Sequence, residues 1–133
     1  MIYGIGHDIV DNQRINKLIV RYQQRFLQHI LTPLEINIYT SGTSSSNFVA
    51  KRFAAKEAFA KACGTGLRSP ILLTNISILN DSLGRPYLVL AEELVAWLNS
   101  SGISQWHLTL SDEKQFSSAV VVLEKLNLRG NDV

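Results

Sequence analysis

Residues 48–66, FVAKRFAAKEAFAKACGTG, are the stretch that most constrains how this chain can fold. Apart from its charged positions the stretch consists mainly of Ala and Phe, which favour a helix and close packing. It ends in a Gly-x-Gly turn, where Gly64 and Gly66 allow backbone conformations closed to other residues. Its only acid is Glu57, and the cations of this region are Lys51, Arg52, Lys56, Lys61 and Arg68. Such one-sided charge suits the binding of a polyanion, for example a phosphorylated cofactor.

The spacing of these charges divides the helix into two stripes, because residues four positions apart lie on one face. Glu57 and Lys61 share the first stripe, and Arg52 and Lys56 share a second one about 100° round the helix. Two interpretations are open at this point. The Glu57–Lys61 pair belongs either to a binding site or to an ordinary solvated helix that ends in a glycine cap.

The N-terminal sequence favours the binding site. The apolar residues within 2–10 predict a short buried strand, which Asp8 interrupts. A carboxylate in such a strand is disfavoured unless it has a partner or a function. Because Mg²⁺ is typically held by one or two protein carboxylates together with phosphates and waters, Asp8 and Glu57 form a candidate metal-binding pair. The alternative is that Asp8 ends the strand or caps the next helix, and Asp11 is the better candidate for that cap.

Residues 12–30 give the clearest amphipathic helix pattern. Its expected buried stripe consists of Ile15, Leu18, Ile19, Tyr22 and Phe26. Its other face carries Arg14, Lys17, Arg21 and Arg25. No acid lies between Asp11 and Glu35, so this basic face predicts an acidic partner. A basic surface helix without a partner is the competing interpretation. Nucleic acid is disfavoured, because no recognition-helix motif is present and the formal net charge is only +2.

Length and composition predict one globular domain over 1–126, followed by a frayed tail at 127–133. The only cysteine, Cys63, cannot form an intramolecular disulfide, and we interpret it as a packing residue. Because no cleavable signal and no apolar run of about 18 residues appears, we expect a cytoplasmic protein that does not enter a membrane.

Turn signals and periodicity predict the remaining elements. Helices are expected at 33–39, with Thr32 as the cap, and at 92–99; 41–47 is expected to be a loop. Strands are expected at 75–79 and 87–90, and a hairpin from 106–111 and 118–124. The three valines at 120–122 favour a strand that is covered on both faces.

Four motifs together resemble one known family. They are GIGHDIVD near the N-terminus, RFAAKEAFAKACGTG about 40 residues later, NDSLGRPYL at 80–88 and WHLTLSDE at 106–113. The chain is similar over nearly its whole length to the bacterial holo-[acyl-carrier-protein] synthases, the small trimeric class of 4′-phosphopantetheinyl transferases. The resemblance implies an α+β fold, a single domain with an antiparallel sheet and a long basic amphipathic helix. It also implies a homotrimer with active sites at subunit interfaces.

The resemblance implies a reaction that supports fatty acid biosynthesis. Coenzyme A binds with Mg²⁺ on its diphosphate, and a serine hydroxyl of apo acyl carrier protein attacks the β-phosphorus. Phosphopantetheine passes to the serine and adenosine 3′,5′-bisphosphate leaves. Phosphoryl transfer of this kind depends on positioning and charge neutralisation more than on covalent help.

Residue roles carried over from the family are expectations for this chain. The metal ligands would be Asp8 and Glu57, and the catalytic residues would be Glu57, Lys61 and Asp8. The coenzyme-binding positions would be Arg52, Lys56, Lys61, Gly64, Gly66, Pro86 of the Gly84-Arg85-Pro86 element, His107 and Thr109. The carrier protein would dock on Arg14, Lys17, Arg21 and Arg25. Glu57 is the first candidate for the base, directly or through a water, while Lys61 would neutralise the leaving group or relay the proton.

The motifs leave two alternatives and show one departure. The chain could be a coenzyme A or nucleotide-binding module without turnover, or a transferase for a peptidyl or polyketide carrier domain. Many family members have Ser-His-Glu or Ser-His-Asp after the last strand motif, whereas this chain has Ser111-Asp112-Glu113. We therefore assign no essential acid–base role to that position.

Overall fold

The computed structural model describes residues 1–42 and 45–126, so the predicted tail at 127–133 lies outside the described residues. The elements in chain order are β1 (Ile2–Asp11), α1 (Asn12–Tyr22), α2 (Gln24–Ile30), α3 (Pro33–Ser41), α4 (Ser46–Cys63), the 3₁₀ turn η1 (Leu73–Asn75), β2 (Ile76–Asn80), β3 (Pro86–Leu90), α5 (Glu92–Ser100), β4 (Ile103–Asp112) and β5 (Phe116–Lys125). The predicted α+β architecture is confirmed, and so are its helices and strands, with two exceptions. The first helix is broken, and β1, predicted as a short buried strand, is ten residues long with Ile2, Ile5 and Ile9 exposed.

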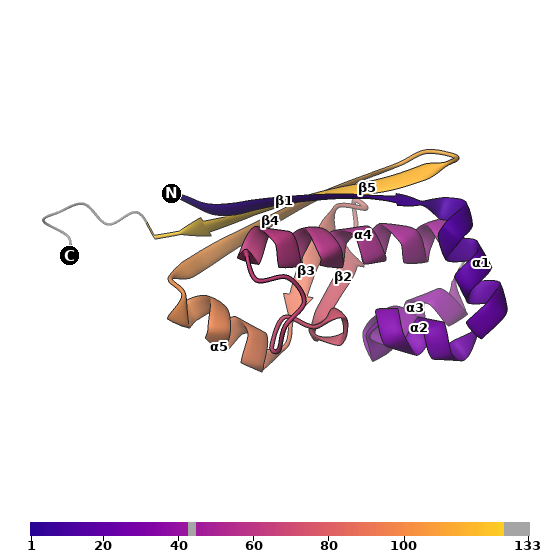
Figure 1. Cartoon of the computed structure of the whole chain (residues 1–133), viewed down its shortest axis with the longest axis horizontal. Coiled ribbons are helices and arrows are strands. Elements are labelled where there is room, and N and C mark those ends of the chain that lie inside the picture. The colour runs from indigo at the N-terminus through magenta and orange to yellow at the C-terminus, as the bar shows by residue number, and fades with distance from the viewer. Residues whose placement is uncertain (43–44, 127–133) are drawn as a thin grey trace, which may run out of the picture.

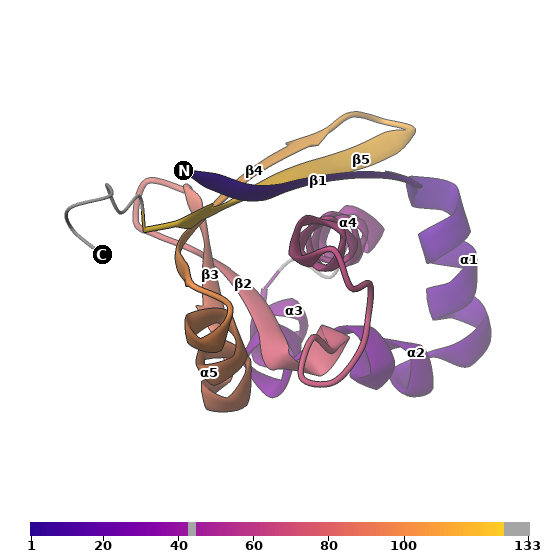
Figure 2. The same ribbon diagram turned by 60° about the vertical axis from the view of Figure 1, so that its left-hand side comes forward.

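A three-stranded antiparallel sheet forms the upper layer, in the order β1-β5-β4. In both views all the labelled helices lie on one side of this sheet, and α4 runs along it beneath β1 and β5 (Figures 1 and 2). The second, two-stranded sheet pairs β2 with β3, and β3 passes under β4. The site-bearing helix α4 is therefore enclosed between the large sheet above and α2, α3 and β2 below.

Alternation along the strands decides which side chains meet α4. On β5, Ala119, Val121 and Leu123 are buried on the α4 side, whereas Val120 and Val122 are half-buried on the opposite side. Ile5 and Ile9 of β1 belong to that opposite side, and each is 59% exposed. We call this side the outer face. We expected β5 to be covered on both faces. Within the described part of a single chain, only the face toward α4 is covered.

Two glycines of β1 let α4 approach the sheet at backbone distance. A Cβ built on Gly6 would overlap the carbonyl oxygen of Ala58, and one on Gly4 would overlap that of Ala62. The facing residues of α4 are largely alanines, and Ala54, Ala58 and Ala62 are all buried. The contact between strand and helix is therefore made largely by main chain, with no room for an added methyl group.

We expect Gly6→Ala to lower the free energy of unfolding by about 1–3 kcal/mol or more, because the added methyl forces α4 away from β1. Urea denaturation of the variant and the wild type measures the change. A loss below about 0.5 kcal/mol, the range of ordinary surface substitutions, would show that α4 is not seated against β1 as described.

The first amphipathic helix is not continuous, and its prediction as one helix over 12–30 was wrong. The chain breaks at Gln23, where φ is 50°, and continues as α2 in a different direction (Figure 2). Ile15 is buried as predicted, but Tyr22 at the end of α1 is 42% exposed. After the break Leu27 and Ile30 enter the core instead. No glycine or proline marks the break, so the sequence carries no local signal for it.

The start of α1 is fixed by two residues. Asp11 caps the helix as predicted, because its carboxylate accepts the backbone N–H of Gln13 at 2.9 Å. The buried Asn12 side chain donates to the backbone oxygen of Glu113 at 2.9 Å and accepts from the Ser117 hydroxyl at 2.6 Å. The turn between β4 and β5 is thereby attached to α1, a link between residues about a hundred positions apart that no local pattern predicts.

The other predicted caps and turns are confirmed. Thr32 caps α3 in a capping box with Glu35, and Gly64 ends α4 in the left-handed conformation at φ 81°. Within the described residues, no helix combines the length and the apolar character that crossing a membrane requires.

Candidate active site

Asp8 and Glu57 line one pocket, although β1 and α4 bring them from positions 49 residues apart. The pocket has a volume of about 240 Å³ and lies between β1, α1, α2 and α4. Its walls include the apolar side chains of Leu18, Phe26 and Phe53. The predicted carboxylate pair is thus brought together in one hollow, which also includes Asp11 and Arg14, and in which water screens the charges less than on an open surface.

The two carboxylates influence each other. The pKa of Glu57 is raised above its ordinary value, first because partial burial disfavours the charged form and second because the negative charge of Asp8 lies close by. Lys61 acts in the opposite direction and lowers the pKa of Glu57. Both carboxylates line the same pocket, and a bound cation would relieve the repulsion between their charges.

Lys61 closes the group on the solvent side. Its ammonium donates to the backbone oxygen of His7 and to the Asp8 carboxylate, both at 3.0 Å. The Lys61 side chain is 54% exposed, whereas that of Asp8 is 17% exposed. Asp8, Glu57 and Lys61, predicted as one functional set, therefore lie together, with one positive charge against two negative ones.

The donors present fit a hard divalent cation. Magnesium takes carboxylate oxygens at one or two positions and leaves the others to water and phosphate. Between them residues 1–42 and 45–126 hold no cluster of three or more His, Cys, Asp or Glu side chains that could hold a metal ion. Asp8 and Glu57 alone match a site that phosphate groups complete, rather than one enclosed by protein ligands.

Arg52 and Lys56 do not lie where the second stripe was expected to present them. Arg52 is 3% exposed and Lys56 is fully buried, and neither lines the pocket of Asp8 and Glu57. The Lys56 ammonium donates to Glu35 at 2.5 Å and to the backbone oxygen of Ile30 at 2.6 Å. The expectation that these two cations face the coenzyme is therefore corrected: in this structure both are held inside the protein.

Glu35 of α3 is the reason for that placement, and the sequence analysis gave it no role. Its carboxylate is fully buried and also accepts the backbone N–H groups of Thr32 and Ile78, each at 2.9 Å. Arg52 lies 3.8 Å from it, and burial lowers the pKa of Arg52 to about 10 while Glu35 opposes that shift. Since that value is far above neutral, Arg52 remains charged in the interior.

The glycine turn after α4 has the conformations that its sequence predicted. Gly64 and Gly66 have φ values of 81° and 70°, which residues with a side chain rarely adopt. Cys63, the preceding residue, is buried, and burial raises the pKa of its thiol to about 12. It fits the predicted packing role, because such a thiol is hardly ionised at neutral pH.

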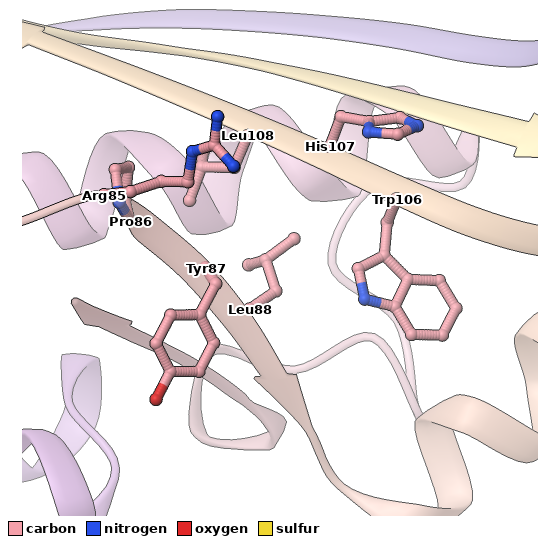
Figure 3. A pocket seen from close by; sticks show the side chains of 7 residues that line it. All are labelled: Arg85, Pro86, Tyr87, Leu88, Trp106, His107 and Leu108. Carbon is pink, nitrogen blue, oxygen red and sulfur yellow. The ribbon is translucent and has the colours of Figure 1, made fainter. Parts of the chain in front are cut away.

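A second cavity of about 400 Å³ lies between β3 and β4, at the other edge of the large sheet. Figure 3 shows its lining side chains, with Arg85 to Leu88 coming from the β3 side and Trp106 to Leu108 coming from β4. Pro86 and His107, two predicted coenzyme positions, lie here; Arg85, Tyr87 and Trp106 were not predicted. His107 leaves β4 on the side opposite to Trp106 and contacts Glu124 at 2.6 Å.

The predicted coenzyme positions therefore fall into two groups within one chain. Asp8 and Val10 alternate toward the α4 side of the sheet. His107 and Thr109 are exposed, alternate with the half-buried positions of β4 and belong to the outer face. Between them stands β5, which pairs with β1 on one side and β4 on the other. A single chain does not bring His107 and Thr109 to the pocket of Asp8 and Glu57.

The predicted docking cations are exposed. Arg14, Lys17 and Arg21 line a shallow hollow along α1, and Arg14 also lines the pocket of Asp8 and Glu57. Arg25 lies beyond the break at Gln23, in another hollow shared with Tyr22 and His29. The basic surface thus starts at the carboxylate pocket and bends with the chain.

Comparison with known proteins agrees with this arrangement. The profile of the 4′-phosphopantetheinyl transferase superfamily matches residues 4–121, which include most of β1, all of α4 and the residues that line the second cavity. The chain belongs to this superfamily.

Among relatives of this transferase, the holo-[acyl-carrier-protein] synthase of Nitrosomonas eutropha is 49% identical over 125 residues, which are 94% of this chain and 100% of that protein. The crystal structure of the holo-[acyl-carrier-protein] synthase from Neisseria meningitidis is 47% identical and has a TM-score of 0.91, over 94% of this chain and 100% of that one. The Bacillus anthracis synthase, solved in complex with coenzyme A (3′,5′-ADP), is 38% identical with a TM-score of 0.79, over 95% of this chain and 99% of that one.

Proposed function

We propose that this chain transfers 4′-phosphopantetheine from coenzyme A to a serine of apo acyl carrier protein, as the names of its relatives indicate for them. The observation that carries the proposal is the meeting of Asp8, Glu57 and Lys61 at the pocket that Arg14 extends onto the basic helix α1. Fatty acid biosynthesis in the cytoplasm is the context that this reaction implies.

The chain's own residues would act on the diphosphate as follows. The serine oxygen forms a bond to the β-phosphorus, the bond from that phosphorus to the bridging oxygen breaks, and the electron pair leaves with adenosine 3′,5′-bisphosphate. Lys61 already donates its hydrogen bonds to His7 and Asp8, which suits neutralising the leaving phosphate better than accepting a proton. Glu57, which lines the pocket beside Asp8, is our candidate to take the serine proton, directly or through a water.

Asp8 and Glu57 would hold Mg²⁺ in this proposal. When bound, the ion would supply positive charge for the phosphate oxygens of the coenzyme. The support is chemical: two neighbouring carboxylates with a single ammonium leave a net negative charge in a partly buried pocket.

The proposed working form is a homotrimer in which neighbouring chains complete each site. Support comes from the outer face, where Ile5 and Ile9 are each 59% exposed beside the half-buried Val120 and Val122. Since His107 and Thr109 lie on this face, covering it with another chain would bring them near the coenzyme site of that neighbouring chain. Light scattering in line with size-exclusion chromatography tests the oligomeric state. A monomer at micromolar concentration would contradict this part of the proposal.

Intact-mass spectrometry of apo acyl carrier protein, incubated with this chain, coenzyme A and Mg²⁺, tests the reaction itself. We expect the carrier to gain the mass of one phosphopantetheinyl group, and a chelator to abolish the gain. If another transferase modifies the same carrier and this chain does not, a peptidyl or polyketide carrier domain is the next substrate to try. Coenzyme A binding without transfer to any of these carriers would favour the non-catalytic module.

The docking surface predicts a selective kinetic defect. Arg21→Glu should raise the KM for carrier protein about tenfold or more, because it replaces an attraction for an acidic partner with repulsion. The KM for coenzyme A should change less than about twofold, since Arg21 does not line the carboxylate pocket.

Lys125→Glu, the same charge change at the end of β5, serves as the control for total charge. Raising the ionic strength should reduce the difference in the KM for carrier protein between Arg21→Glu and the wild type. Equal increases in both KM values for Arg21→Glu would point to a damaged site rather than lost docking.

A further inference from the structure

The turn before Pro86 has an unusual attachment to the rest of the chain. Residues 81–85 connect β2 to β3 and are all exposed, and Leu83 reaches 93% exposure. The turn is held internally by the Asp81 carboxylate, which accepts the N–H groups of Leu83 and Arg85, both at 2.9 Å. Gly84 has a φ of 85°, which suits glycine. The turn is thus well defined in shape, but its orientation depends on where it is anchored.

The strand pairing lacks one backbone donor where the turn begins, beside the bond from the Asp81 N–H to the Arg85 backbone oxygen at 2.9 Å. Asn80 is the last residue of β2 and faces Pro86 of β3 in the register. Because proline has no backbone N–H, Pro86 donates no hydrogen bond to the ladder. The Asn80 side chain reinforces this place, because its amide nitrogen donates to the Gly84 backbone oxygen at 2.9 Å. The Asn80 side chain therefore supplies a hydrogen bond next to Pro86, where the backbone of Pro86 has no donor.

Asn80 is itself held by α4. The Arg52 guanidinium donates to the Asn80 side-chain oxygen at 3.1 Å, and it lies over the Phe48 ring at 3.5 Å from the ring centre. Arg52 is fixed from the other side by Glu35. A continuous path of contacts thus runs from α4, the helix that carries Glu57, through Arg52 and Asn80 to Gly84.

The far end of this path borders the second cavity, which Arg85 and Pro86 line together with His107 (Figure 3). We propose that Arg52 and Asn80 are positioning residues for the coenzyme: they orient the Gly84–Pro86 turn that receives its nucleotide end, and neither touches it. This inference rests on the proposed function. It explains how a buried cation of α4 serves coenzyme binding without being exposed to the ligand.

Two substitutions of Asn80 separate its two hydrogen bonds. Asn80→Ala removes both, whereas Asn80→Asp keeps an acceptor for Arg52 and removes the donor to Gly84. We expect both variants to bind adenosine 3′,5′-bisphosphate about fivefold more weakly or worse in calorimetry, as the loss of one hydrogen bond permits. Ser82→Ala, in the same exposed turn, should bind it like the wild type.

Steady-state kinetics adds a readout that a purely structural role would not move. The KM for coenzyme A should rise in both Asn80 variants, while kcat and the KM for carrier protein stay within about twofold of wild type. Asn80→Asp should keep the melting temperature near the wild-type value, because its carboxylate still pairs with Arg52. That variant keeps the test decisive even if Asn80→Ala folds poorly.

Unchanged bisphosphate affinity in Asn80→Asp, at a wild-type melting temperature, would overturn the positioning role. Equal losses for coenzyme A and for carrier protein would overturn it as well, because they would indicate a general disturbance. A wild-type protein that binds neither coenzyme A nor the bisphosphate would instead refute the proposed function, so the two failures are distinguishable.

Discussion

Asp8→Ala should lower kcat by on the order of a hundredfold or more while the fold stays intact. The magnitude follows from removing one preorganised charged group at a phosphoryl-transfer site. The fold should persist because the Asp8 partner is the exposed Lys61, and exposed ion pairs contribute little to stability. The substitution also removes the negative charge that contributes to the raised pKa of Glu57. Carrier modification followed by mass spectrometry, with thermal melting in parallel, measures both effects.

Asp112→Ala is the matched control for Asp8→Ala, since it removes the same charge from another strand of the sheet and Asp112 does not line the pocket. Its own contacts are with Lys51 at 3.8 Å and Asn47 at 3.3 Å. A titration of each variant with Mg²⁺ adds a direct test of the metal pair. Asp8→Ala should need more Mg²⁺ for half-maximal binding of coenzyme A, and Asp112→Ala should not. Full turnover without Asp8 would refute its role as a metal ligand.

Glu35→Ala should lower the free energy of unfolding by about 3–5 kcal/mol, because it leaves a buried ammonium and a buried guanidinium without their counter-charge. Lys56 would keep only the backbone oxygen of Ile30, and Arg52 would keep its contacts with Asn80 and Phe48. Urea denaturation at neutral pH measures the loss. Glu93→Ala, an exposed acid of α5, is the control and should change stability by less than about 0.5 kcal/mol.

The loss caused by Glu35→Ala should depend on pH. Burial already lowers the pKa of Lys56 below 10.5, against the opposing influence of Glu35, and removing Glu35 lowers this pKa further. The unfolded state then binds more protons than the folded state between the lowered pKa of Lys56 and its ordinary value of 10.5, so the stability of the variant rises with pH over that window. The difference from wild type should therefore shrink as the pH is raised from neutral toward that value. A difference that grows instead would show that Lys56 is not the group left unpaired.

Replacing the ion pair as a whole gives a further check. Glu35→Leu combined with Lys56→Met should be more stable than Glu35→Ala, because no unpaired buried ammonium remains at position 56. A double variant as unstable as the single one would show that the unpaired Lys56 ammonium is not the main cost, and would leave it with the Arg52 guanidinium or with packing.

Local signals predicted most of the fold. Periodicity located the helices at 33–39 and 92–99 and the strands around the two hairpins, and the structure confirms each within a few residues. The same signals placed Thr32, Asp11 and Gly64 at helix ends, where side-chain and backbone chemistry decides the outcome within one turn. These predictions succeed because the deciding interactions lie between near neighbours in the sequence.

The features that were missed depend on partners far away in the sequence. On a helical wheel, Arg52 and Lys56 look like any exposed basic pair. Only the fold places Glu35 next to them. Asn12 likewise contacts a turn about a hundred residues later. At the break at Gln23 the chain changes direction, and Leu27 and Ile30 are buried after it, with no local signal in the sequence. The candidate site was predicted in part. The motifs indicated Asp8, Glu57 and Lys61, but they did not indicate the apolar side chains that line the pocket beside them.

The contact between the β1 glycines and the α4 alanines has an evolutionary consequence. Because Gly4 and Gly6 meet the carbonyl oxygens of α4, the relative placement of β1 and α4 is fixed by main chain rather than by large side chains. Drift in other parts of the core can therefore proceed without separating the two carboxylates. The exposed cations of α1 take no part in this contact, so changes among them would leave the spacing of β1 and α4 unaltered.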